Sequence, residues 1–89
     1  MKVLKFGAKW CLGCMTMKPR WEKIEKETPW LKTEFYDFDE DKRMVKKHKI
    51  DKSLPVFVFL DKKGHEIERL RGTVSREKIL EKINEYRKK

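Results

Sequence analysis

The sequence predicts an α/β domain in which a mixed four-stranded sheet is flanked by three helices. One observation is the order of the predicted elements: strand, helix, strand, helix, strand, strand, helix. A second is the continuously apolar run PVFVFL at 55–60, which is typical of a strand covered on both faces. A third is the length of 89 residues, which suffices for one core but not for two. We therefore expect a single domain spanning residues 1–89.

The first two predicted elements are a strand and a helix. The short apolar run at 3–7 (VLKFG) predicts a buried strand, in which Lys5 is unexpected. Residues 11 to about 26 predict a helix, although its first turns are not cleanly periodic. Pro19 lies inside this helix. It should kink the helix or reset its start, because proline lacks an amide donor and crowds the preceding turn.

The middle of the chain predicts a second strand and a short helix. The aromatic-rich segment 33–38 favours a strand. Asp39 is a candidate N-cap for the following helix, which we expect to end near Lys47. A strand–helix–strand opening implies a parallel pair, so the strands at 3–7 and 33–38 should lie parallel.

The last third of the chain predicts a hairpin and a closing helix. After the strand at 55–60, residues 61–64 (DKKG) predict a turn, and 66–71 predict a charged strand suited to a sheet edge. The two strands of this hairpin should be antiparallel. Gly72 breaks the chain, and Ser75 is a favourable helix cap. The apolar face of the closing helix consists of Ile79, Leu80, Ile83 and Tyr86.

Composition and charge limit the classes of function. The formal net charge is +9, which indicates a solvated basic surface or, alternatively, attraction to an acidic partner. The basic residues are spread along the chain, so nucleic-acid binding has little support. No apolar stretch approaches membrane-spanning length, and Lys5 interrupts the first apolar stretch, unlike a signal peptide. With only two cysteines and no disulfide framework, we expect a monomer in the reducing cytoplasm.

Both cysteines lie in one motif at residues 10–14 (WCLGC), just after a strand and at the opening of a helix. Cysteines at this spacing on a first helical turn can bring their sulfurs within bonding reach. Cys11 lies near unpaired amides and the positive end of the helix dipole, which favour its thiolate, the attacking species in disulfide exchange. Lys5 and Lys9 are candidates for further thiolate tuning. We expect Cys11 to attack a substrate disulfide and Cys14 to resolve the mixed disulfide.

A metal site is the competing interpretation of the cysteine pair. A structural zinc ion requires four ligands, usually a second cysteine pair or histidines. Only His48 and His65 remain, and neither has suitable spacing. We therefore expect no metal and no cofactor, the redox-active pair Cys11–Cys14 being the reactive group.

Several motifs in a fixed order extend the cysteine pattern. They are the segment 6–11 (FGAKWC), Pro19, the pair 54–55 (LP) before an apolar strand, Gly64 and Gly72. In these features the chain resembles the thioredoxin family over nearly its whole length, shortened at the amino terminus to roughly glutaredoxin size. The resemblance implies a thioredoxin-like fold and a protein-disulfide reductase that transfers electrons to disulfide-containing protein substrates. It also implies regeneration by a thioredoxin-reductase-like or glutathione-based reductant.

The resemblance assigns further site residues. It implies that the Leu54–Pro55 bond is cis and lies beside the active-site sulfurs. The backbone before this proline would pair with an extended substrate segment, and Trp10 would form part of the substrate-facing surface.

Three departures from the family pattern limit what can be carried over. Leu12 and Gly13 stand where thioredoxins usually have Gly-Pro, so neither the redox potential nor the thiol pKa transfers. Lys5 occupies the position of a buried aspartate that assists proton transfer, and a lysine cannot act as a carboxylate base. The family's first strand and helix are not found, which leaves a sheet edge or a helix face that thioredoxins cover.

Two alternative functions stay open at this point. One is a glutathione-coupled, glutaredoxin-like reductase, which the short length favours. The other is a basic, non-catalytic binding module with the same fold, in which the net charge of +9 recruits an acidic partner. The pattern around Trp10 and Pro55 favours the thioredoxin-like reductase over the glutaredoxin-like one.

Overall fold

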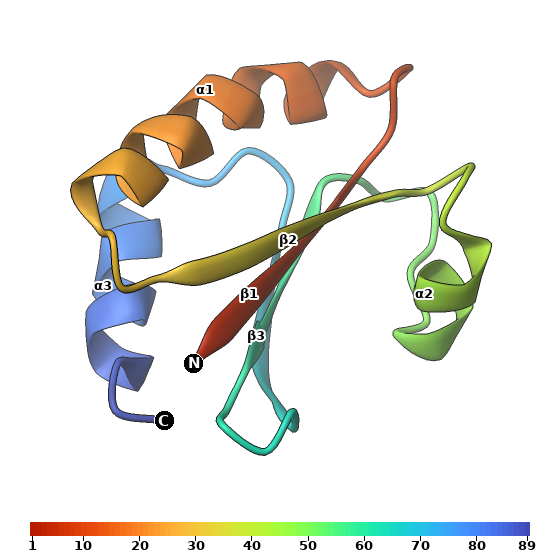
Figure 1. Ribbon diagram of the computed structural model, residues 1–89. Helices are drawn as coiled ribbons and strands as arrows, with labels where there is room; N and C mark the ends of the chain where they lie inside the picture. The colour runs from red at the N-terminus through yellow and green to blue at the C-terminus, as the bar shows by residue number, and fades with distance from the viewer.

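The computed structural model describes residues 1–89 and contains every predicted element in the predicted order (Figure 1). The alternation of strands and helices confirms the α/β class inferred from the sequence. The elements are β1 (Lys2–Gly7), α1 (Leu12–Glu27), β2 (Lys32–Asp37), α2 (Lys42–Lys47), β3 (Val56–Leu60), β4 (Glu66–Arg71) and α3 (Arg76–Tyr86).

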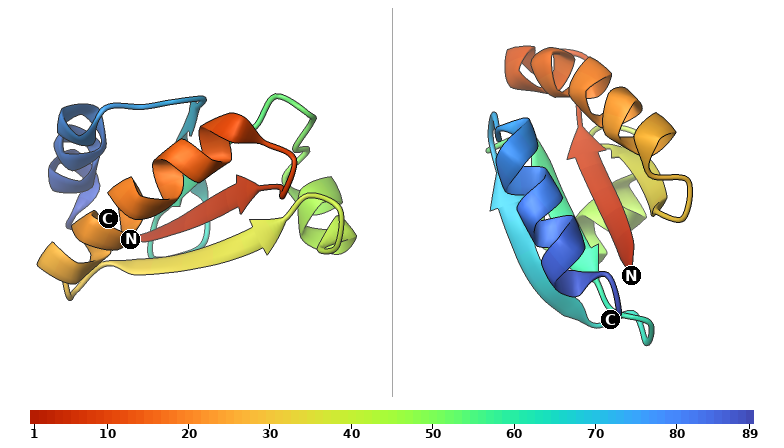
Figure 2. Two further views of the ribbon diagram at one scale, coloured as in Figure 1. Left: turned by 90° about the horizontal axis from the view of Figure 1, so that it is seen from above. Right: turned by 90° about the vertical axis from the view of Figure 1, so that its left-hand side faces the viewer.

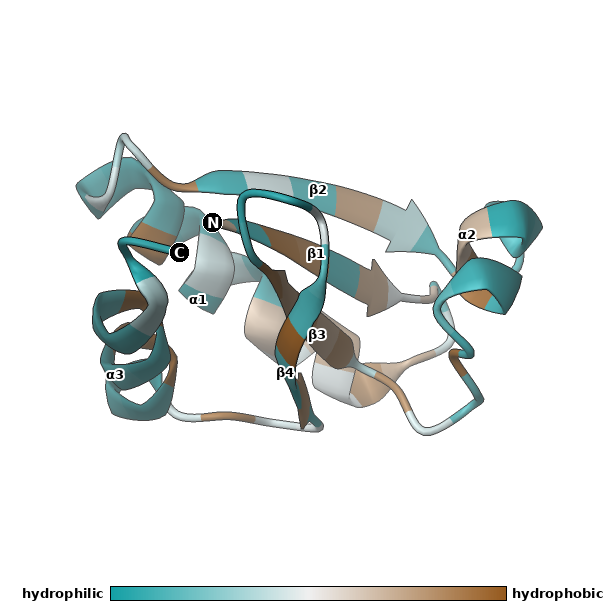
Figure 3. Cartoon of the chain, turned by 90° about the horizontal axis from the view of Figure 1, so that it is seen from below, coloured by the Kyte–Doolittle hydropathy of each residue, from teal (hydrophilic) through white to brown (hydrophobic).

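The four strands form one mixed sheet in the order β2-β1-β3-β4. Strands β1 and β2 are parallel, as the strand–helix–strand opening predicts, and β3 is antiparallel to both β1 and β4. Every residue of β3 is buried, which confirms that the PVFVFL run is a strand covered on both faces. In Figure 3 the hydrophobic colour gathers on β1 and β3, at the centre of the sheet.

The helices cover both faces of the sheet. Helices α1 and α3 pack on one face, where Trp21, Ile79 and Phe59 belong to one core cluster (Figure 2). The short helix α2 packs on the other face, where Met44 packs against the core cluster that contains Phe6. Successive residues of a strand point to opposite faces, so β1 supplies both clusters. Both cores are thus built on the same central strands, β1 and β3. The cysteines follow shortly after β1, so their position is fixed by a strand that is packed on both faces.

Lys5 is accommodated in the sheet by an ion pair. Its side chain is 17% exposed, and its Nζ lies 2.5 Å from Oε2 of Glu25 on the covering helix α1. The same Glu25 oxygen accepts a hydrogen bond from Oγ1 of Thr33, at 3.0 Å. The ammonium also lies 5.8 Å from the centroid of the Trp21 ring. The lysine that is unexpected in the strand therefore has a specific partner, which the sequence did not reveal.

The helix boundaries differ from the prediction at two residues, Cys11 and Asp39. Helix α1 runs through Pro19 as one helix from Leu12 to Glu27, so of the two effects predicted for this proline, a reset of the helix start does not occur. Cys11 is the N-cap of this helix rather than its first residue. Asp39 does not cap α2, because that helix begins only at Lys42. An N-cap must directly precede the first helical residue, and Asp39 lies in the preceding turn.

The turn between β2 and α2 is held by a different carboxylate. The buried Asp37 accepts hydrogen bonds through Oδ2 from the backbone amides of Asp39 and Glu40, at 2.9 and 3.0 Å. Asp41 Oδ2 accepts in turn from the Asp37 amide at 2.7 Å. These bonds end β2 one residue before the predicted end of the strand and free the Asp39 side chain for another contact.

The glycines after β3 and β4 lie where the family resemblance places them. Gly64 has a φ of +86° in the β3–β4 turn, and Gly72 has a φ of +77° just after β4. Side chains rarely adopt this left-handed conformation, so glycine is the residue suited to both turns. Beyond the fold itself, none of the helices has both the length and the apolarity needed to cross a membrane.

The two tyrosines should titrate late. Tyr86 donates a hydrogen bond to Glu68, which with burial raises the pKa of Tyr86 to about 12. Tyr36 donates to Glu34 at 2.7 Å, which raises its pKa above the usual 10.0. The neutral phenol makes each bond, so the stabilisation is complete below pH 10 and is lost as the pH rises through the folded-state pKa.

Tyrosinate absorbance measured against pH tests this expectation. Two transitions should appear, both above pH 10, with the Tyr86 transition the later. Glu68→Gln should return the Tyr86 transition toward 10 and leave that of Tyr36 in place. A single transition of both phenols near pH 10 would contradict the assignment.

Candidate active site

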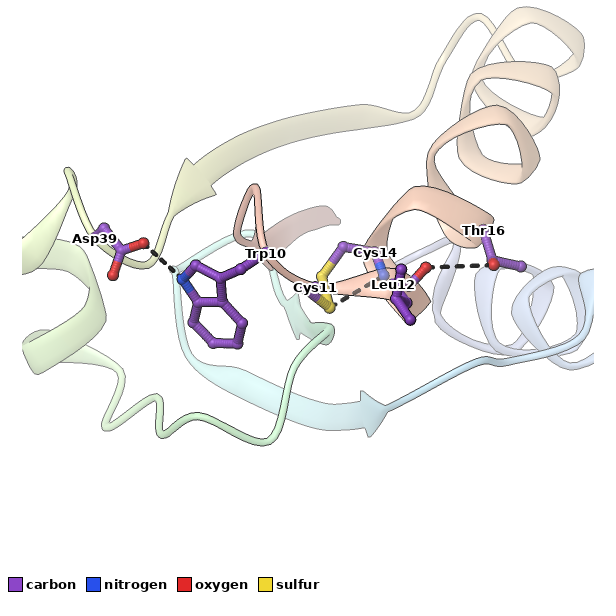
Figure 4. The surroundings of a disulfide bond; sticks show 6 residues. All are labelled: Trp10, Cys11, Leu12, Cys14, Thr16 and Asp39. Atoms are coloured by element: carbon purple, nitrogen blue, oxygen red, sulfur yellow. Dashed lines mark hydrogen bonds between the residues drawn. A yellow bond between two sulfur atoms is a disulfide. The ribbon is translucent and has the colours of Figure 1, made fainter.

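The cysteine pair caps and opens helix α1 at the carboxyl end of β1. Cys11 is the N-cap, with extended backbone angles, and Cys14 lies in the first turn. The two form a disulfide, with their Cα atoms 5.2 Å apart (Figure 4). The Cys11 Sγ accepts a hydrogen bond from the Cys14 backbone amide at 3.1 Å. When the disulfide opens, this amide and the helix dipole stabilise negative charge on the Cys11 sulfur.

The two cysteines differ in exposure. Cys11 is 6% exposed, whereas Cys14 is partly exposed. Accessibility thus does not single out Cys11. What singles it out is the hydrogen bond to its sulfur at the start of the helix.

The Leu54–Pro55 bond is cis, as the family resemblance implies. Pro55 lies directly against the cysteine loop, because a Cβ built on Gly13 would stand only 3.2 Å from Pro55 Cδ. Glycine at position 13 therefore permits the close approach of the two loops. The structure brings together the cysteine motif and the segment at 54–55, which are about forty positions apart in the sequence.

Not every backbone amide and carbonyl on either side of this bond has a hydrogen-bond partner. The Pro55 carbonyl accepts from the Gly72 amide at 2.8 Å, and the Leu54 amide donates to the Lys52 carbonyl at 2.9 Å. The Leu54 carbonyl oxygen has no hydrogen-bond partner. It is the backbone group left free to accept a hydrogen bond from an extended segment laid beside it.

Trp10 is exposed and yet fixed in place. Its side chain is 52% exposed, and its indole Nε1 donates to Asp39 Oδ2 at 2.8 Å (Figure 4). Its ring also meets Phe38 edge to face, with centroids 6.1 Å apart. Sequence reasoning missed Asp39 as a site residue because the residue matched a helix-capping pattern, and no local signal marks a contact across 29 positions.

Exposed apolar side chains surround the cysteines on the first turn of α1. Leu12 is 80% exposed and Met15 is 60% exposed. Together with Trp10 they form an exposed apolar surface beside the disulfide. The sequence indicated this exposure through the lack of clean helical periodicity in the first turns, because apolar residues outside a periodic face do not point into the core.

The lysines predicted to tune the thiolate have different environments. The Lys5 ammonium is directed to Glu25, so its charge is largely balanced by its own partner. Lys9 is exposed at the surface. Both lysines line the cavity that also contains Cys14. Tuning of the thiols by either lysine stays a prediction.

No cluster of three or more His, Cys, Asp or Glu side chains is arranged to hold a metal ion. The reactive feature at this end of the sheet is the cysteine pair. A mixed sheet with a cysteine pair at the start of its first long helix, and a cis-proline against that pair, defines the class of thioredoxin-fold dithiol proteins.

Comparison with known proteins identifies the family. Residues 1–85 match the family model described as Thioredoxin, and the chain belongs to the thioredoxin family. It is 33% identical over 85 residues to thioredoxin H8 of Arabidopsis thaliana, covering 94% of this chain and 55% of the plant protein. The chain thus spans little more than half the length of that relative.

Solved structures confirm the predicted thioredoxin-like fold. Thioredoxin of Fasciola hepatica superposes with a TM-score of 0.85 at 31% identity, covering 94% of this chain and 78% of that one. Thioredoxin NaTrxh of Nicotiana alata gives a TM-score of 0.85 at 26% identity, covering 94% and 70%. Members of this family use their cysteine pair rather than a bound cofactor, in line with the chemistry predicted for Cys11 and Cys14.

Proposed function

We propose that this chain is a thiol–disulfide oxidoreductase that reduces protein disulfides through Cys11 and Cys14. The observation that carries the proposal is the position of Cys11 as the N-cap of α1, with its sulfur accepting the Cys14 amide at 3.1 Å. This arrangement favours the thiolate of one cysteine of a pair already at bonding distance. Membership of the thioredoxin family supports the same reaction.

The reaction has two exchange steps. The Cys11 thiolate attacks one sulfur of the substrate disulfide and forms a mixed disulfide, while the other substrate sulfur leaves as a thiolate. The Cys14 thiolate then attacks the Cys11 sulfur and releases the second substrate thiolate. Two electrons pass from the protein to the substrate, and the Cys11–Cys14 disulfide remains. Both cysteines belong to one helical turn, so the second step needs no unfolding of α1.

The substrate surface consists of groups on both sides of the disulfide. Trp10 offers an apolar ring that is held by Asp39, and the Leu54 carbonyl offers a free acceptor beside the cis-proline. An extended segment carrying a disulfide could lie between them, with its backbone N–H donating to Leu54. Trp10, Leu54 and Pro55 are thus proposed as substrate-binding residues.

The regenerating reductant is a thioredoxin-reductase-like flavoprotein or a glutathione-based system. The presence of just two cysteines, both in the reactive pair, favours a reducing compartment such as the cytoplasm, with the chain acting there as a monomer in electron transfer. Reduction of the oxidised protein by each system in turn separates the two reductants. Faster reduction by glutathione would favour the glutaredoxin-like alternative.

The proposal is tested by turnover. A catalytic amount of the protein should accelerate the reduction of a disulfide-bonded protein by dithiothreitol, and the double variant Cys11→Ser/Cys14→Ser should not. Equal rates with the wild-type protein and the double variant would overturn the proposal. Retention of one stoichiometric acidic partner by both proteins would then favour the binding module.

The contact between Trp10 and Asp39 gives a second expectation. Asp39→Ala should raise KM for a protein disulfide about fivefold, the equivalent of about 1 kcal/mol for one exposed hydrogen bond, and leave kcat unchanged. Asp39→Asn retains an acceptor oxygen for the indole N–H and should restore most of the lost affinity. Equal impairment of both variants would contradict a positioning role for this contact.

A further inference from the structure

A cavity lies beside the disulfide, and Pro55 of the cis-proline loop forms part of its lining. Its volume is about 480 Å³, and it opens between the first half of α1 and the strands β1 and β2. Among its lining residues are Cys14, Gly7, Phe35, Met15 and Trp21. Cys11 is not among them. The cavity therefore gives access to one sulfur of the pair and not to the other.

The wall next to the Cys14 sulfur is formed by a residue without a side chain. A Cβ built on Gly7 would lie 3.2 Å from Cys14 Sγ and 3.2 Å from Phe35 Cε1. Phe35, on the edge strand β2, is 60% exposed and lines the same cavity as Cys14. This arrangement agrees with the partial exposure of Cys14 and the 6% exposure of Cys11.

We propose that this cavity admits a low-molecular-weight thiol, which attacks Cys14 of the oxidised protein and thereby reduces its disulfide. The inference rests on the proposed function in one respect: both require that Cys11 and Cys14 are a redox-active pair. It assigns to Cys14 a second role, as the point of entry for electrons.

The electrons balance over two exchange steps. The thiolate of the small molecule attacks Cys14 Sγ and forms a mixed disulfide with it, and the Cys11 thiolate leaves. A second small thiolate attacks the small-molecule sulfur of the mixed disulfide and releases the Cys14 thiolate. Two thiols become one small disulfide, and the protein gains two electrons.

The geometry of the pair favours this direction of attack. Disulfide exchange is faster when the leaving sulfur has the lower pKa. Attack at Cys14 expels Cys11, whose sulfur accepts the Cys14 amide at the positive end of α1. Attack at Cys11 would expel the sulfur that lacks this bond.

The walls of the cavity define the class of thiol. Its apolar side chains, Met15, Trp21 and Phe35, suit an aliphatic or aromatic body. Charges of both signs line it: Lys5, Lys9, Lys18, Glu22, Asp37 and Glu40. Among them Lys5 is paired with Glu25, and the Asp37 carboxylate is held by two amides. Because positive and negative side chains balance, the cavity does not favour a thiol that carries a particular charge. Its volume suits a small molecule rather than a protein loop.

Single-cysteine variants test the proposal independently of turnover. Cys11→Ser leaves only Cys14, and Cys14→Ser leaves only Cys11. Each is reacted with two mixed disulfides that release the same chromophore, thionitrobenzoate: one formed with mercaptoethanol, the other with a single cysteine on a folded carrier protein. The ratio of the two rates, taken for each cysteine separately, cancels its thiolate fraction and reports access.

The ratio should differ between the cysteines. For Cys14 we expect the small reagent to react at least about 100-fold faster than the protein reagent, and for Cys11 less than about 10-fold faster, because rates of exchange depend on access to the sulfur. Similar ratios for the two cysteines would overturn the proposal. So would a Cys14 that reacts with neither reagent.

Two matched glycines show whether the cavity is the route. In the Cys11→Ser protein, Gly7→Ala adds a methyl group at the Cys14 wall and should slow the small reagent about tenfold. Gly13→Ala adds the same group at a glycine that does not line the cavity, 3.2 Å from Pro55 Cδ, and should leave that rate within about twofold. Equal effects of the two substitutions would overturn the assignment to the cavity.

A substitution at an exposed residue tests the same cavity if the Gly7→Ala protein does not fold. Phe35→Ala removes an exposed wall of the cavity, so the protein reagent should gain access and the ratio for Cys14 should fall severalfold. An unchanged ratio would count against the cavity. Loss of turnover with an intact difference between the cysteines would instead overturn only the proposed function.

Discussion

Cys11→Ser should reduce the turnover of protein disulfides by at least about 100-fold, because the first exchange step requires a thiolate and serine offers none at neutral pH. The rate to be measured is the reduction of a disulfide-bonded protein by dithiothreitol in the presence of each variant. The effect follows from the N-cap position of Cys11 and the amide hydrogen bond to its sulfur.

Cys14→Ser is the matched control, because it removes the other sulfur of the same pair. It should also lose turnover, but the first step survives, so substrates should accumulate as mixed disulfides with Cys11 that are visible by non-reducing electrophoresis. Cys11→Ser should accumulate none with protein substrates. The reverse pattern would show that Cys14 is the attacking thiol and Cys11 the resolving one. The experiment can decide between the two assignments, because Cys14 is the more exposed cysteine.

Phe59→Ala should produce the largest loss of stability of any single substitution considered. Phe59 is fully buried in β3 and packs against Tyr86 of α3, with ring centroids 6.1 Å apart. Truncation of a buried aromatic side chain costs about 3–5 kcal/mol, through lost transfer free energy and the cavity left behind. A native domain has a free energy of unfolding of roughly 5–15 kcal/mol, so this loss is a large fraction of the whole.

Phe35→Ala makes the same chemical change at a position that is 60% exposed. It should alter the free energy of unfolding by less than about 0.5 kcal/mol. Urea unfolding of both variants measures the difference, and an unchanged m-value would show that the native and unfolded states keep their compactness. Equal losses in the two variants would contradict the burial of Phe59 in the structure.

The elements of the fold could be predicted because their signals are local. The apolar run at 55–60 and the periodic face of the last helix depend only on neighbouring residues. Prediction failed where a local pattern competed with tertiary contacts. Asp39 resembles a helix cap in the sequence, yet its carboxylate binds the Trp10 indole. Pro19 resembles a helix boundary, yet α1 continues through it, with Met17 and Trp21 buried on either side.

By itself the sequence determined the candidate reactive group of this protein: a cysteine pair at the opening of a helix, in the order of motifs that the thioredoxin family shares. The spacing within 10–14 is short enough for sequence to fix the geometry of the pair. The tertiary structure alone decided what surrounds it. The partner of Lys5, the anchor of Trp10 and the cavity at Cys14 all join residues distant in sequence. Such contacts depend on how the chain packs, which no local pattern encodes.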